Sequence, residues 1–121
     1  MEVYTMKTIM LSPQSDKNAV KTAADLILQG EVVGMPTETV YGLAANALNG
    51  EAVAKIFRAK GRPQDNPLIV HIADFDQIYS LCPAVPPQAK ALAEAFWPGP
   101  LTMIVPKGDC IPDEVSCGLE T

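Results

Sequence analysis

Apolar residues recur along residues 15–30 at intervals of three and four positions, which is the spacing of one helical face. This face runs from Val20 to Leu28, with Ser15 before it as a candidate N-cap and Gly30 after it. Glycine often follows the last turn of a helix, because it tolerates a left-handed backbone. The pattern therefore predicts a first helix that ends before Gly30.

Three later segments repeat the helical spacing. The second helical face ends at Lys60, and the third opens with Pro86 and Pro87, since proline fits the first turn of a helix. Residues 74–81 carry a shorter pattern of the same kind. The apolar positions of the two longer faces are Ala52, Val53, Ile56 and Phe57, then Ala89, Leu92, Ala93 and Phe96.

Four short apolar runs alternate with these helices and predict strands at residues 8–11, 31–35, 68–72 and 101–105. Asn66 and Pro67 form a turn before the third run, because a residue before proline is driven out of the α region. Strands and helices that alternate at these lengths predict one layered α/β domain over residues 1–121. Residues 107–121 show neither spacing, so we expect no closing helix or strand there.

The composition agrees with a single domain that buries a core, because 48% of the 121 residues are hydrophobic. No apolar run approaches the roughly 18 residues that a membrane-spanning helix needs. The first residues lack the apolar stretch and cleavage site of a secretory leader. We therefore expect a soluble, cytoplasmic protein with no membrane partner.

The formal net charge of -5 is unevenly spread. Residues 1–62 carry seven Lys and Arg against six Asp and Glu, whereas residues 63–121 carry two against eight. Four cations, Lys55, Arg58, Lys60 and Arg62, lie close together with no acid between them. This balance excludes a general nucleic-acid binder held by bulk charge, but a small basic pocket for a phosphate-bearing ligand stays open.

The cysteines and the single histidine argue against a metal site. Cys82, Cys110 and Cys117 are odd in number and have no CxxC spacing, which excludes a disulfide framework and a zinc ribbon. Reduced thiols that pack as small hydrophobic side chains are the simplest interpretation. His71 is the only histidine, so we expect no protein-held metal ion.

Residues 35–47 follow a predicted strand and carry polar groups suited to a ligand. Loops at the ends of strands in α/β sheets converge on a crevice, where ligands bind. Thr37 and Thr39 offer hydroxyls, Tyr41 a polar ring, and Gly42 a place for close backbone approach. An ordinary strand-to-helix loop, with threonines solvating its own backbone, is the alternative.

Residues 55–72 combine a basic helix end with a histidine in a strand. Lys60 and Arg62 flank Gly61 and can both face one anion such as a triphosphate, although cations at a helix C-terminus also satisfy its dipole. Strand alternation places His71 on the same face as Ile69. His71 is then either a ligand-binding residue or a core residue with its hydrogen bonds satisfied.

Residues 96–105 are interpreted as scaffold, because aromatic residues and prolines form a stiff corner between a helix and a strand. The chain contains neither GxxxxGK[ST] nor GxGxxG, which excludes a P-loop and gives a dinucleotide-binding fold no support.

Taken together, the segments PTETVYGL, KGRP-x-x-NPLIVHI and FWPGPLT, in this order and spacing, resemble the YrdC-like threonylcarbamoyl-AMP synthases. The resemblance extends from Leu28 to Thr121. It implies a YrdC/RibB-type fold, a twisted mixed sheet flanked by helices around a positively charged cavity. The implied enzyme is a nucleotidyltransferase that forms threonylcarbamoyl-AMP and pyrophosphate from L-threonine, bicarbonate and ATP, with Mg²⁺ on the phosphates.

The resemblance also implies roles for individual residues. Thr39 and His71 would bind L-threonine, and no residue is assigned as the catalytic acid or base. The product would pass to a downstream tRNA-modifying transferase complex that makes N6-threonylcarbamoyladenosine at tRNA position 37, with tRNA or double-stranded RNA as a further partner. ATP would be bound by Lys60, Arg62, Asn66 and Thr121.

One departure from the family limits this hypothesis. The family continues beyond this point with an arginine-bearing strand and an S-x-N motif that completes the ATP site, and the sequence ends at Thr121. We therefore expect a domain truncated at its C-terminal end, with an incomplete fold and weak or no synthase activity. Two alternatives stay open, a non-catalytic nucleotide- or RNA-binding module of the same fold and the carbamoyl-AMP-using domain of hydrogenase maturation.

Overall fold

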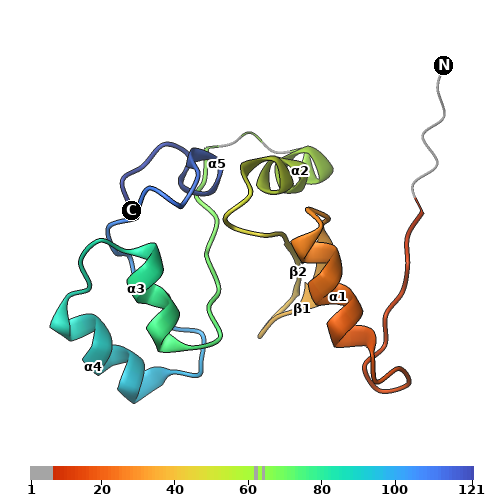
Figure 1. The fold of residues 1–121 in the computed structure, drawn as a ribbon, viewed down its shortest axis with the longest axis horizontal. Coiled ribbons are helices and arrows are strands. Elements are labelled where there is room, and N and C mark those ends of the chain that lie inside the picture. The colour runs from red at the N-terminus through yellow and green to blue at the C-terminus, as the bar shows by residue number, and fades with distance from the viewer. Residues whose placement is uncertain (1–6, 62, 64) are drawn as a thin grey trace.

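The structure is a computed structural model that describes residues 7–61, 63 and 65–121. α1 and the two strands lie on one side of the molecule, α3 and α4 on the other, and α2 and α5 between them (Figure 1). No helix in the described ranges is long and apolar enough to cross a membrane. The elements are α1 (Ala19–Leu28), β1 (Val33–Pro36), β2 (Tyr41–Ala44), α2 (Gly50–Lys60), the 3-10 turn η1 (Phe75–Gln77), α3 (Ile78–Leu81), α4 (Pro87–Phe96) and α5 (Asp113–Ser116).

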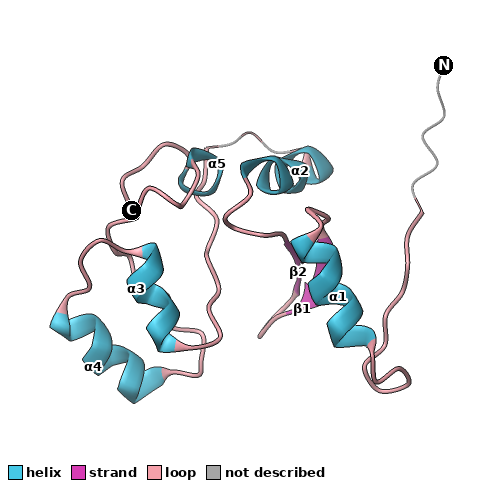
Figure 2. Ribbon diagram, in the orientation of Figure 1, coloured by secondary structure: helices cyan, strands magenta, loops and turns pink. Residues whose placement is uncertain are grey.

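β1 and β2 form an antiparallel hairpin, in which Val33 pairs with Ala44 and Pro36 with Tyr41. The turn between them is closed by two bonds to one carbonyl, because both the backbone N–H and the hydroxyl of Thr37 donate to the Val40 oxygen. The resemblance predicts a larger twisted sheet, and this pair is the sheet found among the described residues (Figure 2).

The first helix ends where the sequence predicts, but it begins later. α1 has Asn18 as its N-cap, and Ser15 instead lies in the preceding turn, where its N–H bonds to the Ser12 oxygen at 3.1 Å. Gly30 has a φ of +85°, a left-handed conformation that ends the helix. Lys55 of α2 then donates from Nζ to the Gly30 oxygen at 2.8 Å, which ties α2 to the end of α1.

The hydrophobic core lies between α2 and α5 and not around a sheet. Its buried residues are Val53 and Phe57 of α2, with Ile111 and Val115 from the last part of the chain. Partly buried residues from other segments pack against these four: Ala47, Leu68, Val70, Leu81 and Cys117. Residues 68–72 are therefore attached to the core by their side chains.

Two predicted strands, residues 68–72 and 101–105, are extended but belong to no ladder. Their side chains still alternate, since Leu68 and Val70 are half-buried whereas Ile69 is 61% exposed. Within the described ranges, no backbone hydrogen bond joins the two segments to each other. The Leu68 N–H bonds instead to the Val115 oxygen at 2.8 Å.

Three further expectations are corrected by the structure. Residues 8–11 are not a strand, because their backbone has no pairing partner among the described residues. β2 was not predicted, since it is four residues long and lies in a segment with the composition of a loop. α5 was not predicted either, because one helical turn is too short to show a 3.6-residue period.

Candidate functional site

A cavity of about 500 Å³ lies between residues 68–72 and residues 101–105. Apolar side chains of both segments make most of its wall, with Ile78 and Leu81 of α3 closing it on one side. Ile111 and Val115 of the core also contribute to the wall. The cavity is therefore an apolar groove in which a few polar groups decide what can bind.

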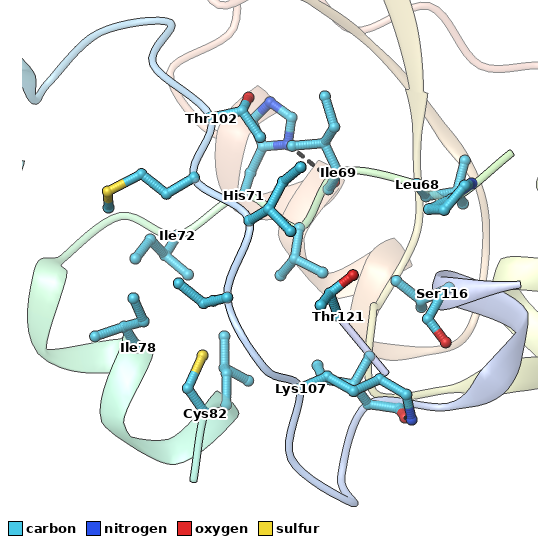
Figure 3. A pocket seen from close by; sticks show the side chains of 18 of the residues that line it. Leu68, Ile69, His71, Ile72, Ile78, Cys82, Thr102, Lys107, Ser116 and Thr121 are labelled. Atoms are coloured by element: carbon cyan, nitrogen blue, oxygen red, sulfur yellow. Dashed lines mark hydrogen bonds between the residues drawn. The ribbon is translucent and has the colours of Figure 1, made fainter. Parts of the chain in front are cut away.

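The polar groups of the cavity come from separate parts of the chain. Figure 3 shows Thr102 and His71 on one side of the view and Lys107 on the opposite side. Glu38, from the turn between β1 and β2, also lines the cavity and is the part of the hairpin that reaches it. Segments from both halves of the chain thus meet at this one hollow.

The ring of His71 is oriented by the backbone of its own segment. Its Nδ1 lies 3.3 Å from the Ile69 oxygen (Figure 3). With the proton on Nδ1, the ring donates to that carbonyl and Nε2 remains a hydrogen-bond acceptor. His71 is exposed and lines the cavity, so it is not a core residue.

Glu38 places a negative charge at the rim of the cavity. It is exposed, and its carboxylate makes no hydrogen bond or ion pair with another described residue. The turn that carries it is held by the bonds from Thr37 to Val40 described above. The carboxylate is therefore available to a cationic group of a ligand.

Lys107 and Ser116 form the other polar part of the wall. The side chain of Lys107 is 19% exposed, and its Nζ donates to the Ile111 oxygen at 3.0 Å and lies 3.5 Å from Asp113. The hydroxyl of Ser116 is buried without a hydrogen-bond partner among the described residues. An anion near Lys107 would thus compete with Asp113 for the ammonium group.

The structure brings only part of the predicted site to this cavity. His71 and Thr121 line it, whereas Thr39, Lys60 and Asn66 do not. Lys60 is exposed at the end of α2, and Asn66 is exposed in the following turn. Arg62 lies outside the described residues.

Four polar residues of the cavity were missed from the sequence: Glu38, Thr102, Lys107 and Ser116. Glu38 adjoins Thr39 in the segment already singled out, so that segment was a usable signal. Thr102 belongs to a predicted strand that was interpreted only as scaffold. Lys107 and Ser116 have no signal in the sequence, because they reach the cavity through the unpredicted fold of residues 107–121.

The described residues contain no group of three His, Cys, Asp or Glu side chains that could hold a metal ion. A dedicated protein site for Mg²⁺ is therefore not formed by the part of the chain that the structure describes. Mg²⁺ commonly reaches an enzyme on substrate phosphates with few protein ligands, which is the form compatible with these residues.

The family model named Sua5–YciO–YrdC, with the description telomere recombination, matches residues 25–121. Threonylcarbamoyl-AMP synthase of Pyrococcus abyssi is 53% identical over 102 residues, and that of Bacillus subtilis is 56% identical over 103. Each comparison covers 84% of this chain and 30% of the relative, so the chain spans about a third of the length of these relatives. The crystal structure of P. abyssi Sua5 complexed with L-threonine superposes with a TM-score of 0.83 at 50% identity, over 87% of this chain and 31% of that one.

Proposed function

The chain belongs to the Sua5–YciO–YrdC family, and on that premise we propose that it acts in the formation of threonylcarbamoyl-AMP. The observation that carries the proposal is the identity of 53% and 56% to two threonylcarbamoyl-AMP synthases over 84% of the chain. The substrates would be L-threonine, bicarbonate and ATP, and pyrophosphate would be released. The product would then serve the modification of tRNA by a separate transferase.

The amino acid would bind at the part of the cavity lined by His71 and Glu38. Free L-threonine carries an ammonium and a carboxylate, so a site for it needs a group of each kind. The Glu38 carboxylate, which pairs with no other described residue, suits the ammonium, and the His71 ring suits the carboxylate or the hydroxyl. A relative that superposes on this chain was crystallised with L-threonine, which supports L-threonine as the amino acid in this proposal.

ATP would bind beside the C-terminal end of α2 through Lys60, Arg62 and Asn66, with Thr121 as a further contact. Lys60 makes no ion pair with another described residue, so its charge is available to a phosphate. Lys55 is the member of the basic run that we exclude, because its Nζ is bonded to Gly30 and lies 3.5 Å from Glu31. Thr121 would reach the nucleotide from the cavity side.

The proposed reaction needs few residues that act as a general acid or base. A bond forms between the threonine nitrogen and the bicarbonate carbon while a C–O bond of bicarbonate breaks and water leaves. An oxygen of the resulting carbamate then attacks the α-phosphorus and pyrophosphate departs. Such a reaction is accelerated chiefly by holding the reactants together and by stabilising the charge that develops on the phosphates. Lys60 and Arg62 would do the second task, and the cavity residues the first.

Pyrophosphate release is the direct test of this proposal. The chain is incubated with ATP and bicarbonate, with and without L-threonine, and L-threonine binding is measured separately by calorimetry. Release that depends on L-threonine supports the full reaction. L-threonine binding without release restricts the chain to substrate binding, and ATP binding with no effect of L-threonine favours the nucleotide-binding module. A folded chain that binds neither substrate overturns the proposal.

A further inference from the structure

Two segments far apart in the chain are held together beside the cavity, and each carries a cysteine. The N–H of Gly108 donates to the Leu81 oxygen at 2.6 Å, and the Sγ of Cys110 donates to the Ser80 oxygen at 3.3 Å. The turn around Gly108 is therefore fixed to the C-terminal end of α3. Cys82 is the next residue after that helix, so the same contacts bring Cys110 to its neighbourhood.

Gly108 is what allows this close approach. A Cβ at this position would lie 2.9 Å from the Leu81 oxygen, a backbone atom that cannot move aside without shifting the end of α3. The turn also packs on its own cysteine, because the same Cβ would lie 3.9 Å from the Sγ of Cys110. The close approach of the two segments therefore depends on glycine at position 108.

The two thiols differ in access. Cys110 is exposed, whereas Cys82 is half-buried and lines the cavity. Burial, and secondly the neighbouring Cys110, raise the pKa of the Cys82 thiol. The second cause agrees with the hydrogen bonds that bring Cys110 beside the end of α3. Cys117 directly follows α5, is half-buried against the core, and makes no such contact in the described ranges.

We propose that Cys82 and Cys110 form a reactive dithiol that closes to an intrachain disulfide when a small-molecule disulfide is present. The exposed Cys110 attacks first, as its thiolate, and forms a mixed disulfide while one small thiolate leaves. Cys82, once deprotonated, then attacks the Sγ of Cys110 and expels the second small thiolate. Two protein thiols are oxidised, one small disulfide is reduced to two thiols, and the two protons are passed to the released thiolates.

The bond would alter the cavity as well as the loop. Cys82 lines the cavity wall, and a disulfide would turn its sulfur toward residues 108–111. It would also join the end of α3 covalently to that turn, in addition to the hydrogen bonds made by Gly108 and Cys110. Oxidation would therefore hold the end of α3, which forms part of the cavity wall, in a fixed position against residues 108–111.

The test is to treat the whole folded chain with oxidised glutathione and to map its thiols by mass spectrometry after alkylation under denaturing conditions. The expected result is a fall from three free thiols to one, a Cys82–Cys110 peptide pair, and monomeric protein on a non-reducing gel. Reduction should restore all three thiols. Wild-type protein that keeps three thiols, stops at a glutathione adduct, or links through Cys117 overturns the proposal.

Three variants sharpen the result. Cys117→Ser should still close the bond, whereas Cys82→Ser should accumulate the glutathione adduct on Cys110. Cys110→Ser should react with oxidised glutathione more slowly than wild type, because both thiols that remain, Cys82 and Cys117, are half-buried. Circular dichroism checks that each variant is folded, and the peptide map of wild-type protein decides the proposal even where a variant does not fold.

Discussion

The β1–β2 hairpin and the extended segments 68–72 and 101–105 differ in how their backbone groups are satisfied. The hairpin pairs four residues of each strand, and its turn bonds to itself. Half-buried and exposed side chains alternate along the extended segments, as they do along β2, yet in the described ranges no ladder joins these segments to another strand. Alternation is thus a property of the extended chain lying on an apolar wall, and a sheet additionally needs a neighbouring backbone.

The largest expected effect tests how far the core beneath residues 68–72 stabilises the fold. Phe57→Ala removes a buried ring from the core against which Leu68 and Val70 pack, and should lower the free energy of unfolding by about 3–5 kcal/mol. Urea denaturation measures it. Phe96→Ala is the control, since that ring is 60% exposed and should cost about 0.5 kcal/mol. Equal losses from the two variants would show that this core does not carry the fold.

The second effect compares a glycine of the hairpin with Gly108, which follows the extended segment 101–105 in the chain. Gly108→Ala should cost about 1–3 kcal/mol, because the new Cβ would lie 2.9 Å from the Leu81 oxygen. Gly34→Ala in β1 is the matched change. Apart from its chain neighbours, no atom of the described residues would lie within 4 Å of the new Cβ, so it should alter stability by no more than about 0.5 kcal/mol. Thermal unfolding of the pair decides it. A larger loss at Gly34 would place the tight packing in the hairpin instead.

The third effect tests whether the hairpin contributes to L-threonine binding in the cavity. Glu38→Gln keeps the shape of the side chain and removes its charge, so L-threonine affinity should fall about tenfold, or roughly 1.4 kcal/mol, with ATP affinity unchanged. Calorimetry with each substrate separates the two. Glu51→Gln, on the first turn of α2 and away from the cavity, should leave both affinities unaltered. An unchanged L-threonine affinity for Glu38→Gln would remove the hairpin from the site.

The smallest effect concerns the cavity wall at Cys82. Its pKa is raised from an ordinary value of 9.0, so the folded chain holds this proton at pH values where the unfolded chain has released it. Stability is therefore unaffected by this group below pH 9.0 and should fall as the pH rises above it. Melting temperatures under reducing conditions, compared with Cys82→Ser, measure the difference. A wild-type curve no steeper than that of the variant would contradict the burial of this thiol.

The helices could be predicted because their apolar spacing covers several turns. Gly30 and Gly61 end α1 and α2 in left-handed conformations, as glycine after a helical face predicts. The strands could be predicted only as extended segments, because the sequence of 68–72 carries no information on which backbone lies beside it. β2 and α5 are too short for either period to be visible.

The residue roles proposed for the site rest on the resemblance more than on residue chemistry, and they stay predictions. His71 lines the cavity, and the chemistry of a histidine within an apolar strand had left a core role open. Thr39, Lys60 and Asn66 do not line it, and their roles stay predictions, as does that of Arg62 outside the described residues. Glu38 was overlooked because a single acid in a turn gives no pattern; only the folded hairpin brings it to the cavity.

In the described ranges, residues 69–72 and 102–105 have no strand paired beside them, and this should affect how fast their amide protons exchange. Amide protons that are not held in a ladder exchange with solvent whenever water reaches them, whereas those of the hairpin wait for the strands to open. Placed in heavy water, the chain should thus take up deuterium at two speeds, quickly along the walls of its cavity and slowly in β1 and β2. The amides of the segments that line the proposed site would therefore exchange before those of the hairpin.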